Sequence, residues 1–254
     1  MIRWVQRVLI AALLVAATLA TGCGEAQGKA HDSITKSEAV AFARAVNLRL
    51  DDLRESRSPG AWRKLGAAPE PESASDLSDA RFARCAGLRR ARYVAQLESP
   101  QFDKGTIGAR AELVSSKVLV SPTTELASRP ISALGTSRGR TCFRRLAQPT
   151  SEGGTVRLSI DRVSFSPLGQ VPPGSGVNVR LAGAVIGLSR AKRSVRLYFD
   201  ILVFSIGPAE VVLFAQGWGH PPAPNTEHQL LGKLYRRAKH TAPVFAGRQV
   251  IVIR

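Results

Sequence analysis

Three apolar segments in the second half of the chain, separated by short turn-forming links, constrain the fold more than any other feature. The segments are Val179–Leu188, Val195–Phe204 and Ala209–Ala215. A basic link, SRAKRS, joins the first two, and a Gly-Pro pair stands between the second and the third. Segments rich in β-branched and aromatic residues, joined by short polar links, are typical of β-hairpins. We expect consecutive antiparallel strands here.

The middle segment is apolar on both faces of the strand that it would form. Side chains alternate between the two faces of a sheet. One face would carry Val195, Leu197, Phe199, Ile201 and Val203, and the other Tyr198, Leu202 and Phe204. Because a strand with apolar side chains on both faces is buried on both, we expect helices to cover the two sides of the sheet.

Two segments before these strands have helical periodicity. The first is Ser37–Val46, preceded by Thr35 and with Glu38 in its first turn, which together fit a capping box. The second is Leu126–Leu146, which we expect to be interrupted near Gly135–Gly139.

A third helix is expected near the C-terminus, where Thr226 and Gln229 fit another capping box. Its apolar face would carry Leu230, Leu231, Leu234, Tyr235 and Ala238, and its polar face Lys233, Arg236, Arg237 and Lys239. We expect this amphipathic helix to dock on its own sheet rather than on a membrane.

Further strands are expected earlier in the chain, at Leu88–Gln96 and Ala109–Val120. In the stretch from Val156 to Phe165 the alternation of apolar residues slips by one position, which predicts a β-bulge near Asp161. Residues 56–79 are rich in Ser, Pro, Ala and Glu, and we expect a long loop with Trp62 as its one apolar anchor. The whole indicates a single α+β domain over residues 33–254, with an antiparallel sheet of six or seven strands flanked by helices.

The N-terminus has the pattern of an export signal. Two arginines and no acidic residue precede the apolar run Val8–Ala20, and small residues follow it. A helix of about thirteen residues spans roughly 20 Å, less than the ~30 Å hydrocarbon core of a membrane. We therefore expect residues 1–22 to be a signal peptide.

The sequence LATGC at the end of this segment resembles a bacterial lipobox, although Ala20 stands where that motif usually has leucine. The resemblance implies that Cys23 is acylated and becomes the new N-terminus. Acyl chains would hold the protein on the outer face of the cell membrane, with the polar residues 23–32 as a tether. A plain signal peptide with an incidental cysteine and an uncleaved anchor are the alternatives.

The two remaining cysteines, Cys85 and Cys142, are expected to form a disulfide, because exported proteins keep paired thiols oxidised. Such a crosslink would stabilise the fold by roughly 4 kcal/mol. Two free, buried thiols are the alternative. Neither cysteine has another cysteine or a histidine close by in the sequence, so we expect no metal site and no cofactor.

The order of the elements resembles that of a set of actinobacterial surface lipoproteins. A first helix precedes the segment with Cys85, the strand VSSKVLV, a helix with Cys142, the strands YFDILVFSIGPAEVVLF and the helix TEHQLLGKLYRRAK. This order is also distantly similar to the extracellular sensor domains of actinobacterial receptor kinases. Over Ile34–His240, that similarity implies a PsbP-like α/β/α sandwich that binds or senses a ligand. Such domains typically carry two disulfides, and this chain has cysteines for one.

The sequence gives little sign of catalysis, since it lacks the common hydrolase, metalloprotease, P-loop and dinucleotide-binding motifs. His228 and His240 are more than three helical turns apart and could not share a metal ion. His31 lies in the tether, and His220 stands beside Trp218 in a Pro-rich turn, where an exposed position is expected.

Two acidic residues in predicted strands, Asp161 and Asp200, do not show the convergence that a paired-carboxylate hydrolase needs. An ion pair of Asp200 with Arg180 or Arg196 across the sheet is the ordinary explanation. We therefore expect the protein not to be an enzyme.

Positive charge is the strongest functional signal. The chain has 36 Lys and Arg against 19 Asp and Glu, which gives a formal net charge of +17. Arginines surround both cysteines in stretches without acidic residues: Arg81, Arg84, Arg89, Arg90, Arg92, Arg138, Arg140, Arg144 and Arg145. A disulfide would gather them, and their repulsion would have to be relieved by carboxylates from elsewhere, by solvent or by an anionic partner. A merely solvated surface is the ordinary alternative.

These observations favour a lipid-anchored, extracytoplasmic, non-catalytic binding or sensing module. Besides the membrane reached through its lipid, its expected contacts are anionic lipids or wall polymers, because the guanidinium fork suits phosphate and carboxylate. Nucleic acid, the default partner of so basic a cytosolic protein, is not expected after export. A carrier with an apolar cavity for a lipid, and an envelope hydrolase using His220, are the alternatives. The sequence indicates no protein partner.

Overall fold

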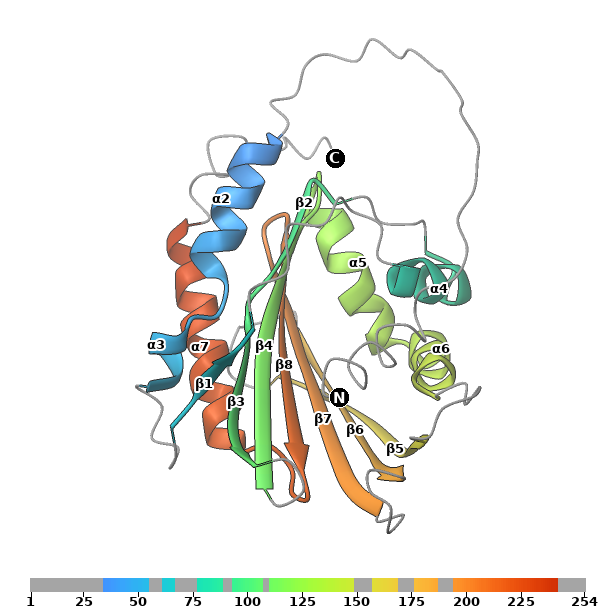
Figure 1. Ribbon diagram of the computed structural model, residues 1–254. Coiled ribbons are helices and arrows are strands. Elements are labelled where there is room, and N and C mark those ends of the chain that lie inside the picture. Colours follow the sequence, from blue (N-terminus) through green and yellow to red (C-terminus); the bar gives the residue numbers. More distant parts are fainter. Residues whose placement is uncertain are drawn as a thin grey trace.

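A single antiparallel sheet lies between two layers of helices (Figure 1). The computed structural model describes residues 34–54, 61–66, 77–88, 93–106, 110–148, 157–168, 176–186 and 194–241. The predicted α+β class is confirmed. The leader, Cys23 and the tether lie outside the described residues, so the predictions for them stay predictions.

Within the described residues the sheet has eight strands, each antiparallel to its neighbours. The order across the sheet is β1 (Arg63–Leu65), β3 (Gln101–Thr106), β4 (Arg110–Val120), β8 (Ala209–Trp218), β7 (Ser194–Ile206), β6 (Gly176–Ile186) and β5 (Arg157–Pro167), and β2 (Ala95–Glu98) also pairs with β4.

Strands β5 to β8 form the predicted meander. In β7, Leu202 and Phe204 pack in one core cluster and Val203 packs in another, on the opposite face of the strand. The expected bulge is present, because the pairing of β5 with β6 shifts by one residue between Ile160 and Arg162. Apolar alternation therefore predicted both the strand faces and the irregularity.

The helices divide between the two faces of the sheet. On one face lie α2 (Lys36–Val46), α3 (Leu50–Arg54) and α7 (Pro224–Thr241), and on the other α5 (Thr124–Gly135) and α6 (Ser137–Ala147), with α4 (Leu77–Ala86) packed on α6 (Figure 1). The capping box at the start of α2 is confirmed, since the side chains and backbones of Thr35 and Glu38 bond reciprocally.

Two expected features are wrong in part. The segment 56–79 is not entirely a loop: β1 pairs with β3 beside the buried Trp62, and α4 begins at Leu77. The second capping box does not form at Thr226, because α7 begins earlier, at Pro224. Proline suits the first helical position, where its missing N–H would be unpaired in any case.

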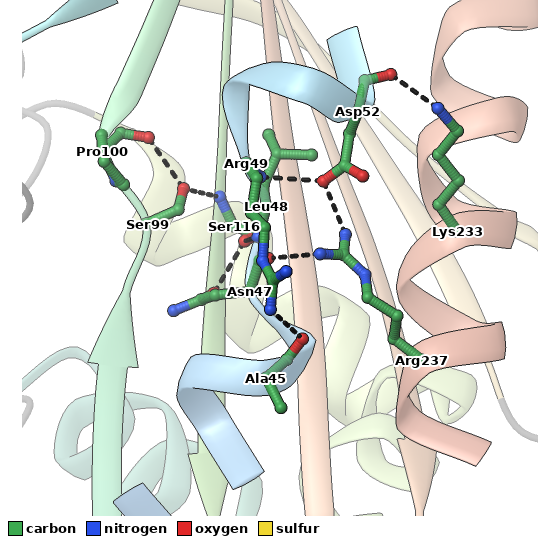
Figure 2. A network of polar contacts seen from close by, with 10 residues as sticks. All are labelled: Ala45, Asn47, Leu48, Arg49, Asp52, Ser99, Pro100, Ser116, Lys233 and Arg237. Atoms are coloured by element: carbon green, nitrogen blue, oxygen red, sulfur yellow. Dashed lines mark hydrogen bonds and ion pairs between the residues drawn. The ribbon is translucent and has the colours of Figure 1, made fainter. Parts of the chain in front are cut away.

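A buried polar network joins α2 to the sheet (Figure 2). Ser116 of β4 is 1% exposed, and its Oγ accepts a hydrogen bond from the backbone N–H of Leu48 at 2.8 Å. The same hydroxyl donates to Oδ1 of Asn47 at 2.7 Å. Ser99, in the bend between β2 and β3, accepts a hydrogen bond from the N–H of Ser116 at 2.9 Å. These bonds fix the turn after α2 on the sheet.

Basic side chains of α7 hold the other side of the same turn (Figure 2). Arg237 donates to the carbonyl of Asn47 at 3.0 Å and to Oδ2 of Asp52 at 2.6 Å, and Lys233 donates to the carbonyl of Asp52 at 2.8 Å. The apolar side of α7 packs on the sheet through Leu230, Leu231 and Leu234, as expected. No helix in the described part of the chain is long and apolar enough to cross a membrane.

A tight elbow at Thr136 separates α5 from α6, where an interruption was expected. The backbone N–H of Thr136 donates to the carbonyl of Ala133 at 2.9 Å, and its side-chain oxygen accepts from the N–H of Gly139 at 3.0 Å. A Cβ atom on Gly139 would lie only 2.0 Å from the carbonyl oxygen of Ala133. Glycine at this position therefore lets α6 turn away from α5.

We predict that Gly139→Ala lowers the free energy of unfolding by about 2 kcal/mol or more, because the elbow must open to admit the methyl group. The control is Gly135→Ala in the same elbow, where a Cβ atom meets nothing within 4 Å. That variant should be neutral or slightly stabilised, because alanine favours the helix. Urea unfolding compares the two, and equal effects would contradict the role given to Gly139.

Candidate functional site

The disulfide joins two helices at the periphery of the fold. Cys85 of α4 and Cys142 of α6 are bonded, with their Cα atoms 5.7 Å apart. Cys142 is 4% exposed, and α4 packs along α6. The predicted pairing is confirmed, and the alternative of two free thiols is wrong.

This crosslink brings together the arginines of α4 and α6. Six of the nine predicted arginines lie in these helices, and we call them the arginine surface: Arg81, Arg84, Arg138, Arg140, Arg144 and Arg145. The other three, Arg89, Arg90 and Arg92, lie outside the described residues. That these residues bind an anion stays a prediction.

Arg138 lies across the junction of the two helices. Its Nε donates a hydrogen bond to the carbonyl of Cys85 at 3.0 Å. A Cβ atom added to Gly87 would lie 3.1 Å from its guanidinium group, so the glycine after α4 leaves room for this side chain. Arg138 thus supports the packing of α4 on α6.

Two arginines one helical turn apart lie over the same aromatic ring. The Cζ atoms of Arg140 and Arg144 are 5.7 and 5.3 Å from the ring centroid of Phe165 in β5. Nε of Arg140 also donates to the carbonyl of Leu134 at 3.1 Å, and Phe143 meets Phe165 edge to face at 5.8 Å. These contacts orient two guanidinium groups at the outer edge of the sheet.

The arginine surface is short of negative charge. Several arginines elsewhere in the structure are paired with carboxylates, as Arg129 is with Glu125. In contrast, the described residues contain no carboxylate that bonds or pairs with Arg84, Arg138, Arg140, Arg144 or Arg145. Like charges at neighbouring positions on a helix disfavour each other, so their repulsion is left to solvent or to an anion from outside.

The histidines do not form a site in the described part of the chain. His228 and His240 are exposed, and Nδ1 of His220 lies 2.9 Å from the carbonyl of Pro221. His31 lies outside the described residues. The described residues contain no group of His, Cys, Asp and Glu that could hold a metal ion.

The two acidic residues considered for catalysis are each paired with a different arginine. Asp161 binds Arg196, and Asp200 binds Arg180, which donates from Nε and Nη2 at 2.6 to 2.9 Å. Of the two partners suggested for Asp200, Arg180 is the correct one. The ion-pair explanation is therefore confirmed for Asp200, whereas the pair of Asp161 with Arg196 was not predicted.

Sequence reasoning missed a third member of the Asp200 cluster. Glu227, in the first turn of α7, lies with its Oε2 3.8 Å from Nη2 of Arg180, and its side chain is 4% exposed. The available signal was its spacing, because Glu227 precedes Leu230, Leu231 and Leu234 on the apolar side of the helix. An acidic residue in the first turn of a helix is ordinarily solvated and stabilised by the helix dipole. For this reason the burial of Glu227 was not predicted.

Burial and a neighbouring carboxylate keep Glu227 protonated. Removal from water is the main cause that raises its pKa to about 9, followed by its hydrogen bond to Asp200 and the charge of Asp200. Arg180 acts in the opposite direction, and the more distant Glu112 adds to the rise. Arg180, Asp200 and Glu227 therefore connect α7 to the sheet, and Glu227 is the protonated member of this cluster.

No family model and no curated protein matches the chain. Among solved structures, the chain is similar to the extracellular domain of PknH from Mycobacterium tuberculosis, with 14% sequence identity and a TM-score of 0.41. The match covers 83% of this chain and 99% of that one. At this identity and score it does not bear on the ligand of the present chain.

We predict that Glu227 makes stability depend on pH. Between the unfolded pKa of 4.5 and the folded pKa of about 9, the folded protein binds a proton that the unfolded chain releases. The free energy of unfolding should therefore fall as pH rises through this window, by at most about 1.4 kcal/mol per unit from this group. Glu227→Gln cannot release a proton and should gain stability relative to the wild type as pH rises.

Urea unfolding of both proteins at a series of pH values between the two pKa values measures the difference. Titrating groups that do not contact Glu227 contribute equally to both proteins and cancel. A stability difference that does not change with pH would show that Glu227 is ionised in the folded protein.

Proposed function

We propose that the protein is an extracytoplasmic, lipid-anchored, non-catalytic binding module whose arginine surface contacts anionic components of the cell envelope. The observation that carries the proposal is the disulfide-linked pair of helices, whose exposed arginines Arg84, Arg138, Arg144 and Arg145 have no carboxylate partner in the described residues. Arginine presents a fork of donors that matches phosphate and carboxylate.

Two features support the location. The disulfide between Cys85 and Cys142 is of a kind that persists in oxidising compartments and is rare in the cytosol. The N-terminal sequence has a basic start, a short apolar run and a cysteine at position 23, as an exported lipoprotein would. Both observations favour a position on the outer face of the cell membrane.

An anchor would strengthen a weak electrostatic contact. Exposed charges act over only ~8 Å at physiological ionic strength, so a basic surface needs to be held near its target. Each arginine at an anionic membrane surface contributes about 1 kcal/mol. An acylated Cys23 would supply the proximity, and the arginine surface would supply the attraction.

The opposite side of the sheet uses its basic residues differently. Arg237 and Lys233 of α7 bind Asp52 and the turn after α2, so these charges stabilise the fold. We therefore assign the attraction for anionic envelope components to the arginine surface on α4 and α6. His220 has no Ser or Asp hydrogen-bond partner in the described residues, and nothing described there favours a hydrolase or a lipid carrier.

Charge reversal on the arginine surface tests the proposal. We expect Arg84→Glu with Arg145→Glu to weaken binding to vesicles that contain phosphatidylglycerol, by about tenfold or more, since two attractive charges become repulsive. The protein is the mature chain with Cys23→Ser, which lacks acyl chains and so cannot insert. Vesicle sedimentation at physiological salt measures the affinity.

The matched control is Lys36→Glu with Lys239→Glu, which changes the net charge equally on exposed residues of α2 and α7. This variant should bind almost as the wild type does. Equal weakening by both variants would mean that net charge alone matters, and absence of wild-type binding would contradict the proposed contact with a lipid surface.

A further inference from the structure

We infer that Arg140 and Arg144, arranged over the ring of Phe165, form a clamp for the phosphate group of an anionic phospholipid. The inference rests on the proposed function and assigns, within the arginine surface, the residues that would bind the head group. The other arginines of that surface would then act mainly through their charge.

The geometry of Arg140 and Arg144 differs from that of the other residues of the arginine surface. Both guanidinium groups lie within 6 Å of one ring centroid, and Arg140 is held further by its bond to the carbonyl of Leu134. An aromatic face attracts a cation and fixes the plane of a guanidinium group. A ligand would therefore meet two oriented groups rather than two freely moving side chains.

The repulsion between these two positive charges favours the binding of a counter-ion. Arg140 and Arg144 are four residues apart on α6, where like charges destabilise a helix. One ring offsets part of this repulsion, but no carboxylate in the described residues neutralises either group. An anion between the two guanidinium groups would relieve the repulsion that remains.

Donor chemistry indicates which anion fits. Each guanidinium group has five N–H donors, and within the described residues only Nε of Arg140 makes an internal hydrogen bond. The remaining donors of two groups exceed what one carboxylate accepts. The phosphodiester of a phospholipid adds two ester oxygens to its two anionic oxygens, and arginine binds phosphate through parallel hydrogen bonds.

The apolar neighbours favour a lipid as the source of the phosphate. Phe165 and Phe143 are half-buried beside the two arginines and contact each other edge to face. Aromatic residues next to cations suit the boundary between head groups and acyl chains. A soluble wall polymer with phosphodiester links offers the same anion without an apolar region. The clamp is therefore assigned to a phospholipid.

Substitution by lysine separates a clamp from a diffuse charge effect. Arg140→Lys with Arg144→Lys keeps both charges but removes the planar forks, and we expect binding to phosphatidylglycerol vesicles to weaken about tenfold. The control is Arg84→Lys with Arg145→Lys on the same surface, which should change the affinity by less than about twofold. Both are made in the mature chain with Cys23→Ser.

Phe165→Leu is a second probe, because it removes the ring and leaves every charge in place. Its affinity should fall as in the Arg140 and Arg144 double variant. Thermal unfolding and a test for the intact disulfide identify any variant that fails to fold. If Phe165→Leu is unfolded, the two lysine variants decide the question alone.

Three other outcomes overturn the clamp, and the first two of them leave the proposed function standing. Equal affinities of the two lysine variants would show that only charge matters, while a loss on charge reversal at Arg84 and Arg145 would keep the proposed function. Displacement from vesicles by soluble poly(glycerol phosphate) at equal phosphate concentration would assign the site to a wall polymer. Absence of wild-type binding to phosphatidylglycerol vesicles would overturn both.

Discussion

The crosslink between Cys85 and Cys142 determines whether the arginine surface exists as one surface. It ties α4 to α6 across 57 residues of sequence, and the backbone elbow at Thr136 sets the direction of α6. Closing a loop of this size stabilises a fold by roughly 4 kcal/mol on the chain-entropy model. Repulsion between exposed arginines amounts to only a few tenths of a kcal/mol for each neighbouring pair. The crosslink therefore outweighs the repulsion of the charges that it gathers.

The two sides of the sheet differ in how several of their arginines are bound. On the side of α2 and α7, two arginines are bound within the fold: Arg237 by Asp52 and Asn47, and Arg180 by Asp200. On the side of α4 and α6, Arg138, Arg140 and Arg144 meet a carbonyl or an aromatic ring, but no carboxylate in the described residues. The net charge of +17 therefore indicates a binding surface only after the basic residues that are bound within the fold have been identified.

Local patterns predicted the parts of the structure that depend on neighbours in sequence. Alternation fixed the faces of β7, the phase slip located the bulge after Ile160, and Thr35 with Glu38 marked the start of α2. Partners that meet only through the fold were missed. The three-residue β1 is visible only by its pairing with β3, and Glu227 looked solvated until α7 was placed over Asp200. The arginines were identified, but their arrangement over Phe165 depends on β5 reaching the edge beside α6.

The oxidation state of Cys85 and Cys142 in the native host tests this account most directly, because a joined α4–α6 surface outside the cytoplasm requires the crosslink. The protein is extracted from host membranes under conditions that prevent thiol exchange, denatured without reductant and treated with a thiol reagent before mass spectrometry. The account predicts that neither cysteine is modified and that one peptide pair is linked. Full modification of both cysteines before reduction would contradict it, since α4 and its arginines would then lack their covalent attachment to α6.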